Sequence, residues 1–162
     1  MKTYLEKNYP YIPFVLIVLF SLFYYINYWN IETSIAWDGL GYYLYLPTTF
    51  IYDDLLIKKY ELYDSLIKKY ELSTTFYQVA KSQNGNWIMK YTMGKSIMMF
   101  PFYYISDWFA QLFNYSRDGF SKPYQIGVFT SGVAYLGLGG LIFTKLLIKL
   151  FKNKLAFLLS FI

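Results

Sequence analysis

The chain has 162 residues, of which 56% are hydrophobic and 24% aromatic, and its formal net charge is +5. It contains neither cysteine nor histidine, which excludes disulfides, thiol chemistry and the commonest general base and metal ligand. The aromatic content is higher than an ordinary soluble core needs and is typical of a membrane protein. Catalysis by this chain therefore has to use carboxylates, lysines or tyrosines.

The first predicted element is a membrane span over about residues 10–29. The uncharged run from Asn8 to Ile31 has 24 residues, and a helix that rises about 1.5 Å per residue needs roughly 20 residues to cross the hydrocarbon core. No small-residue cleavage site follows this run, so we expect it to remain as an anchor.

The segment after this span contains the strongest catalytic candidate, Asp38. A carboxylate at the mouth of a membrane-embedded segment can orient and deprotonate an acceptor hydroxyl. Tyr42 and Tyr43 follow it and are candidate substrate-binding residues. Alternatively, Asp38 only caps the free amides of a helix start, which is the commoner role of such a residue.

Residues 54–72 contain a ten-residue tandem repeat in which each copy carries an Asp and a Lys four positions apart. The apolar spacing predicts an amphipathic helix that lies on the membrane. Further along, residues 75–80 and 87–93 flank Asn84-Gly85-Asn86. Because Asn-Gly favours a turn with positive φ, this pattern predicts a small β-hairpin.

Residues 96–110 are apolar but are interrupted by Pro101 and Asp107, and only 11 uncharged residues separate Lys95 from Asp107. This length predicts an interfacial or re-entrant piece. A second span is expected over about residues 123–144, inside an uncharged run of 22 residues. Residues 155–162 are interpreted as the start of a third span in a longer protein.

The placement of charge predicts the topology. Segment 30–122 has nine basic and nine acidic residues, whereas the two end segments carry six lysines against Glu6. Flanking lysines favour the cytoplasmic side, so the N-terminus is predicted to be cytoplasmic and loop 30–122 extracytoplasmic, in a plasma or inner cell membrane. Because the lysines cluster beside the spans, nucleic acid is not an expected partner.

Together these patterns predict an all-α membrane protein with a single membrane domain. It would have multi-pass transmembrane helices, an extracytoplasmic loop of juxtamembrane helices and a small β-hairpin. Membrane lipids and the remaining spans of the full-length protein are the expected partners. The fragment alone is expected to be inactive, because two or three spans can hardly enclose both a donor and an acceptor.

Several short motifs occur in a recognisable order around the predicted spans. This order resembles the N-terminal part of GT-C-type membrane glycosyltransferases, and the motifs are Trp37-Asp38-Gly39-Leu40-Gly41-Tyr42-Tyr43-Leu44-Tyr45-Leu46-Pro47, Gly94-Lys95, Phe100-Pro101-Phe102-Tyr103 and Asp118-Gly119-Phe120-Ser121. The resemblance implies transfer of a sugar from a polyprenyl-phosphate donor to an extracytoplasmic acceptor.

The resemblance also implies residue roles. Asp38 would be the general base or acceptor-orienting group, Lys95 would meet the lipid phosphate, and Asp107 would face a cavity. A snorkelling Lys95 and a shallow, ordinary Asp107 are the alternatives. The chain lacks a doubled acid or a histidine beside Asp38, so a divalent cation is left open as a cofactor and no metal ligand is predicted.

A second hypothesis is a non-enzymatic multi-pass membrane protein, such as a flippase, a transporter or an assembly subunit. In that case Asp38 caps a helix and the aromatic side chains contact lipid. Later outer loops with further acids and aromatics would favour the enzyme, whereas inverted repeats with broken spans would favour transport.

Overall fold

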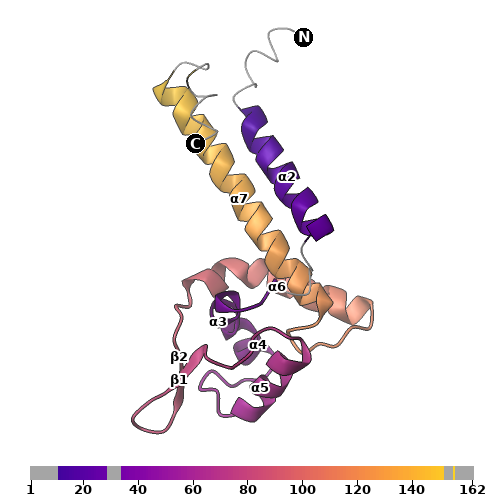
Figure 1. Ribbon diagram of the computed structural model, residues 1–162, viewed down its shortest axis with the longest axis vertical. Helices are drawn as coiled ribbons and strands as arrows, with labels where there is room; N and C mark the ends of the chain where they lie inside the picture. The colour runs from indigo at the N-terminus through magenta and orange to yellow at the C-terminus, as the bar shows by residue number, and fades with distance from the viewer. Residues whose placement is uncertain (1–10, 29–33, 152–154, 156–162) are drawn as a thin grey trace. The chain divides into compact units, whose positions relative to one another are not determined.

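The computed structural model describes residues 11–28, 34–151 and 155 (Figure 1). The chain divides into two compact units, one formed by Met1–Trp29 with Gly132–Ile162 and the other by Asn30–Ser131. Most described residues are helical, and the sheet among them has two strands.

The first unit contains helix α2, Ile12–Tyr28, and the larger part of helix α7, Lys122–Leu150. The two helices approach closely at Gly140, where an added Cβ would lie 1.9 Å from a ring carbon of Phe14. A glycine at this point allows the aromatic ring to lie directly on the α7 backbone, as small residues do between packed apolar helices.

The prediction of a multi-pass fold is wrong. Within the described residues one helix, α7 with 29 residues, is long and apolar enough to cross a membrane by its length and composition. Helix α2 has 17 residues, and its apolar part is Phe14–Tyr24. The length of the uncharged run overestimated the length of the apolar helix, because asparagine and tyrosine carry no charge yet are not apolar. Apart from Leu155, the predicted start of a third span lies outside the described residues.

The second unit contains four further helices and the hairpin. The helices are α3 (Asp38–Tyr43), α4 (Tyr45–Phe50), α5 (Tyr60–Lys69) and α6 (Gly94–Leu112), and the strands are β1 (Val79–Lys81) and β2 (Trp87–Met89). Helices α3, α4 and α6 contact one another in pairs. Their core is rich in tyrosine, with Tyr43, Tyr63 and Tyr124 among its largest fully buried side chains.

The predicted hairpin is confirmed. Strands β1 and β2 pair antiparallel, with Val79 opposite Met89 and Lys81 opposite Trp87. Gly85 has φ of 82° in the turn, as the Asn-Gly pattern requires. The paired strands are three residues each and are therefore shorter than the predicted segments.

The two copies of the tandem repeat fold differently. In the second copy Asp64 pairs with Lys68 on α5, as predicted. In the first copy Asp54 is buried, and its carboxylate accepts the backbone amides of Lys58 and Lys59 at 2.9 and 2.8 Å. The apolar face of α5 is buried in its own unit, so the protein covers the face that was predicted to lie on the membrane.

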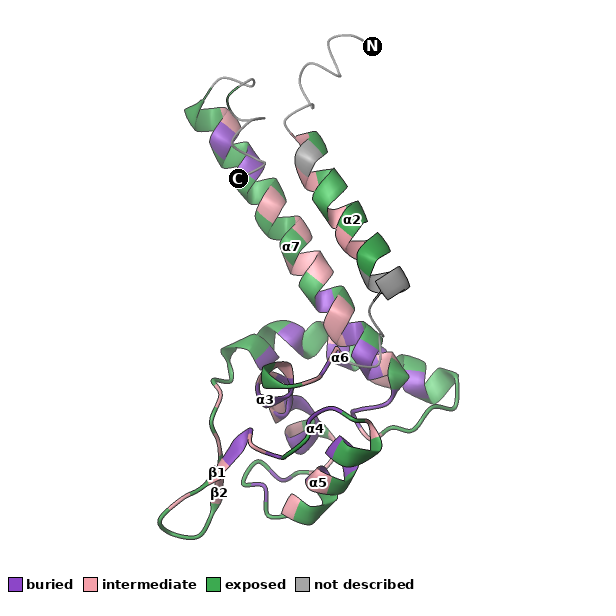
Figure 2. Cartoon of the chain, viewed as in Figure 1, coloured by how far each residue is buried: buried purple, intermediate pink, exposed green. Residues whose placement is uncertain are grey.

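Helix α6 continues through Pro101 and has two contrasting faces (Figure 2). The buried face is small or polar apart from Met99 and Tyr103, and consists of Ser96, Met99, Tyr103, Ser106 and Ala110. The exposed side chains are large and apolar: Ile97, Met98, Phe100, Tyr104, Ile105, Trp108, Phe109 and Leu112. At Gly127, in the first turns of α7, an added Cβ would lie 2.0 Å from Oγ of Ser106. Helix α6 therefore packs directly against the beginning of α7.

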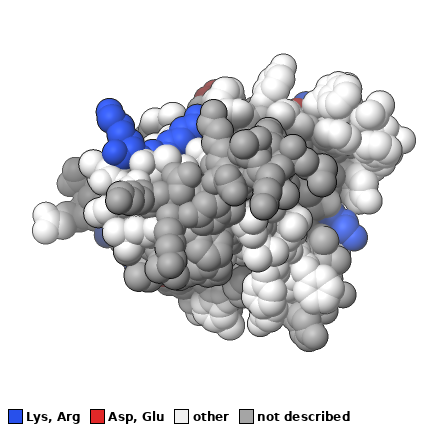
Figure 3. Space-filling model, turned by 90° about the horizontal axis from the view of Figure 1, so that it is seen from above, with Lys and Arg blue, Asp and Glu red and all other residues white. Residues whose placement is uncertain are grey.

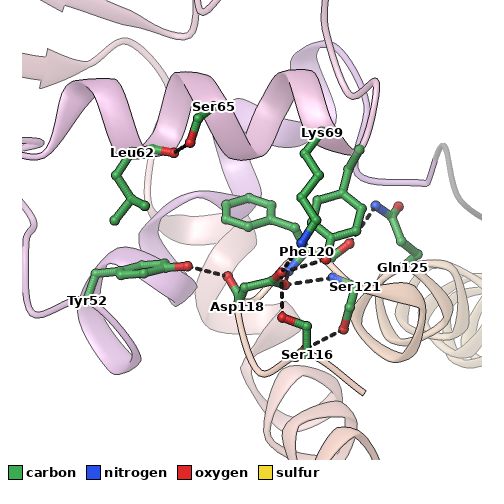
Figure 4. A network of polar contacts seen from close by, with 10 residues as sticks. Tyr52, Leu62, Ser65, Lys69, Ser116, Asp118, Phe120, Ser121 and Gln125 are labelled. Carbon is green, nitrogen blue, oxygen red and sulfur yellow. Dashed lines mark hydrogen bonds and ion pairs between the residues drawn. The ribbon is translucent and has the colours of Figure 1, made fainter. Parts of the chain in front are cut away.

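Asp118 fixes the loop that enters α7 (Figure 4). Its carboxylate accepts the hydroxyls of Tyr70 and Ser116 and the amides of Phe120 and Ser121, all at 2.6–3.0 Å. Its backbone carbonyl accepts the hydroxyl of Tyr52 at 3.0 Å. These bonds join the C-cap of α5, the turn after α4 and the start of α7, which makes Asp118 a structural residue.

Candidate functional site

Asp38 is the first helical residue of α3, and the N-cap position belongs to Trp37. Trp37 has φ of 55° and makes no side-chain capping hydrogen bond. The alternative expected from the sequence, in which Asp38 itself is the cap, is therefore not the arrangement seen. The carboxylate of Asp38 points instead to two tyrosines from a distant part of the chain.

Tyr77 and Tyr91 both donate their hydroxyls to Oδ1 of Asp38, Tyr77 at 2.9 Å. Since hydrogen bonds to a carboxylate favour its charged form, the bond from Tyr91 first and that from Tyr77 second hold the pKa of Asp38 below its ordinary value. No hydrogen bond joins Oδ2 to the described residues. Asp38 is thus an exposed, ionised carboxylate with one oxygen held and the other available.

A glycine makes this arrangement sterically feasible. A Cβ at Gly41 would lie 2.1 Å from a ring carbon of Tyr91, a distance that requires the ring to move away. Two further hydrogen bonds hold the ends of the hairpin beside α3 and α4: the Tyr45 hydroxyl donates to the carbonyl of Tyr91 at 2.6 Å, and the Gln78 amide donates to the carbonyl of Trp37 at 3.0 Å.

Lys95 extends the site to the beginning of α6. Its ammonium group lies 5.0 Å from the centroid of the Tyr42 ring, and that ring meets the Tyr91 ring edge-on at 4.9 Å. The Ser96 hydroxyl also donates to the carbonyl of Tyr42. We call the residues Asp38, Tyr42, Tyr77, Tyr91 and Lys95 the Asp38 cluster.

The structure brings together three of the five residues predicted from the sequence and separates the other two. Tyr43 is fully buried, and its hydroxyl donates to the carbonyl of Gly119, so its side chain offers no surface to a substrate. Asp107 follows Lys95 on the same helix by 12 positions, which corresponds to about 18 Å along the axis.

Asp107 lies in a different environment from that of Asp38. Its carboxylate accepts Nε and Nη2 of Arg117 at 3.1 and 2.6 Å, and the hydroxyl of Tyr124 at 2.6 Å. The Arg117 guanidinium is the main cause of a pKa below the ordinary value at Asp107. The pair borders an open cavity of about 220 Å³, which we call the α6 groove and which is lined by Phe50, Ile51, Phe100, Tyr103, Tyr104, Asp107 and Arg117.

Tyr77 and Tyr91 were not predicted from the sequence, although the predicted hairpin contained a signal for them. The register that places Val79 opposite Met89, extended by two residues, places Tyr77 opposite Tyr91. Facing residues on an antiparallel pair have neighbouring side chains. Two tyrosines at matching positions beyond a predicted hairpin thus indicate a pair of hydroxyls that can share one acceptor.

Among the described residues, no group of three or more acidic side chains is arranged to hold a metal ion. No protein-family model, curated protein or solved structure matches the chain. What the Asp38 cluster can do is therefore inferred from its own chemistry.

Proposed function

We propose that this chain acts in glycosyl transfer at a membrane surface, moving a sugar from a lipid-phosphate donor to an extracytoplasmic acceptor hydroxyl bound at Asp38. The observation that carries the proposal is the carboxylate of Asp38, whose Oδ1 accepts the hydroxyls of Tyr77 and Tyr91 and whose Oδ2 accepts no hydrogen bond from the described residues. Such a group is oriented in advance and accepts one more hydrogen bond without rearrangement.

The acceptor hydroxyl donates its hydrogen bond to Oδ2 of Asp38. As its oxygen bonds to the anomeric carbon of the donor sugar, the bond from that carbon to the phosphate oxygen breaks. The proton passes to the carboxylate, and the lipid phosphate leaves with the bonding electrons. Because the pKa of Asp38 is lowered, the carboxylate orients the hydroxyl first and takes the proton late in the step.

Lys95 and Tyr42 supply the donor side of the cluster. The exposed ammonium group of Lys95 is a compact positive charge of the kind that binds phosphate. The Tyr42 ring beside it provides flat apolar surface for the carbon-bound face of a sugar. The Lys95 ammonium group and the Asp38 carboxylate are thus separated by the rings of Tyr42 and Tyr91. This separation suits a sugar that lies between the phosphate and the acceptor.

Two features support a place at the membrane. Helix α7 is the candidate span, and α6, which carries Lys95 in its first turn, exposes the large apolar face described above. A helix with one such face is suited to lie at the boundary of head groups and acyl chains. The described residues seen in Figure 3 are mostly uncharged, with small separate groups of Lys or Arg atoms. On this proposal loop 30–122 is extracytoplasmic.

The roles of Asp38 and Lys95 can be tested separately in membranes that contain the full-length protein, with a radiolabelled lipid-phosphate sugar as donor. We expect Asp38→Asn to lower kcat with little change in the KM for the donor, and Lys95→Gln to raise that KM. Equal effects of both variants on kcat and KM would argue against separate roles. Wild-type kinetics in both would favour a non-enzymatic membrane protein, in which Asp38 only joins α3 to the hairpin.

A further inference from the structure

We infer that the α6 groove binds a phospholipid whose head group carries both a phosphate and an ammonium group, with the phosphate at Arg117 and the ammonium at Asp107. The groove lies about 18 Å along α6 from Lys95 and shares no residue with the Asp38 cluster. The inference is therefore independent of the proposed glycosyl transfer.

The inner part of the groove suits an apolar chain. Its walls are mainly aliphatic and aromatic, and Phe50 lies 5.0 Å from Phe100 and 6.1 Å from Tyr103 between ring centroids. The outer wall is Tyr104, which is 69% exposed and belongs to the apolar face of α6. The groove thus opens onto the surface that is expected to contact lipid, so an acyl chain can enter it from the bilayer.

The polar end of the groove carries both signs of charge. Two N–H groups of Arg117 are used by Asp107, and because the arginine side chain is 52% exposed, the other N–H groups remain for a phosphate. Asp107 is 22% exposed at its side chain, and its Oδ2 accepts a single hydrogen bond from the described residues. This neutral pair matches a head group that has both a phosphate and N–H donors.

Charge complementarity also distinguishes the head-group classes. A purely anionic head group brings its phosphate to Arg117 but leaves the Asp107 carboxylate without a cation. A choline head group brings a cation that has no N–H donor. Phosphatidylethanolamine meets both requirements, because its ammonium group donates to a carboxylate in a charge-assisted hydrogen bond.

A buried hydroxyl in the groove wall provides a second, independent indication of a ligand. Tyr103 is 5% exposed, and its hydroxyl has no hydrogen-bond partner among the described residues. Buried hydroxyl groups in native structures nearly always have a partner. An ester oxygen of the bound lipid would accept this hydrogen bond.

The test uses the full chain reconstituted in bilayers of phosphatidylethanolamine, phosphatidylcholine and phosphatidylglycerol in equal amounts with matched acyl chains. After extraction in mild detergent, the retained phospholipids are counted by mass spectrometry. We expect phosphatidylethanolamine to be retained well above its share of the bilayer, and Arg117→Gln to return the retained share toward that of the bilayer. Tyr104→Ala should also reduce it by opening the groove wall.

Phe113→Ala is the matched control for Tyr104→Ala, since Phe113 is a similarly exposed aromatic residue outside the groove. Lys58→Gln is the control for Arg117→Gln, since Lys58 is an exposed cation outside the groove. Both controls should keep the enrichment. Retention in proportion to the bilayer composition, or equal enrichment in Tyr104→Ala and Phe113→Ala, would overturn the inference. Since Tyr104 is exposed, its replacement tests the site even if Arg117→Gln fails to fold.

Discussion

The hydroxyl of Tyr77 donates a 2.9 Å hydrogen bond to Oδ1 of Asp38, a residue 39 positions earlier in the chain. Tyr91, which donates to the same oxygen, comes from the other side of the hairpin. The residues that flank the hairpin therefore hold the carboxylate at the first turn of α3, and we call these two hydrogen bonds the clamp.

The clamp depends on Gly41. We expect Gly41→Ala to push the Tyr91 ring away from α3, because the added Cβ would overlap it, and so to return the pKa of Asp38 toward its ordinary value. The carboxyl carbon of Asp38, followed by NMR during a pH titration, reports this change directly.

Gly39→Ala is the control in the same helix, since its Cβ would meet only the carbonyl oxygen of Ser34 at an ordinary 3.6 Å. It should leave the titration unchanged and stabilise the fold by up to about 1 kcal/mol through helix propensity. If both alanine variants titrate like the wild type, Gly41 is not needed for the contact between Tyr91 and Asp38.

The two tyrosines should contribute unequally to the ionisation of Asp38. Tyr91→Phe is expected to raise the pKa of Asp38 more than Tyr77→Phe, because the bond from Tyr91 is the larger cause of its lowering. A depressed folded-state pKa contributes stability that is present above the unfolded pKa of aspartate, about 3.9, and is lost as the pH falls through the folded value. Acid unfolding of Tyr91→Phe should therefore depend less on pH below about 4. The opposite ranking in the titration would place the stronger bond at Tyr77.

Much of the fold could be predicted from local patterns. The hairpin followed from Asn84-Gly85, and α7 followed from a long apolar run. The membrane fold was mispredicted at α2, because a count of uncharged residues extended the span beyond Tyr24, where the apolar part of the helix ends. The candidate site depends on contacts between distant segments, such as that of Tyr91 with Asp38. The spacing of apolar residues along the chain does not predict such contacts. Tyr42 and Tyr43 were both predicted to bind substrate because they follow Asp38, yet adjacent positions on a helix point in different directions.

Asp118 should matter for stability and not for the Asp38 cluster. Asp118→Asn removes one charged acceptor from a site that serves Tyr70, Ser116 and two amides, so we expect a loss of about 1–3 kcal/mol. Chemical unfolding of the full chain measures it. Asp64→Asn, whose partner Lys68 is exposed, should cost much less, and an equal loss in the two variants would contradict the structural role of Asp118.

Two buried tyrosines should respond in opposite ways to loss of their hydroxyls. Tyr43→Phe breaks the bond to Gly119 and should cost about 1 kcal/mol. Tyr103→Phe removes a hydroxyl that has no partner among the described residues and should leave stability in lipid-free detergent unchanged or slightly raised. Thermal melting of the two variants compares them. A clear destabilisation by Tyr103→Phe in the absence of lipid would mean that this hydroxyl is already satisfied within the protein.

The role of Asp38 is tested most directly by the initial rate of sugar transfer from a labelled lipid-phosphate donor. The rate is measured in membranes with equal amounts of the full-length wild type, Asp38→Asn and Asp53→Asn. Asp53 is an exposed aspartate outside the cluster, and at its φ of 46° asparagine is well tolerated. We predict that Asp38→Asn lowers the rate by roughly 10²–10⁴-fold, as loss of a general base does, while Asp53→Asn keeps it. Transfer by Asp38→Asn at the wild-type rate and abundance would contradict the proposed role.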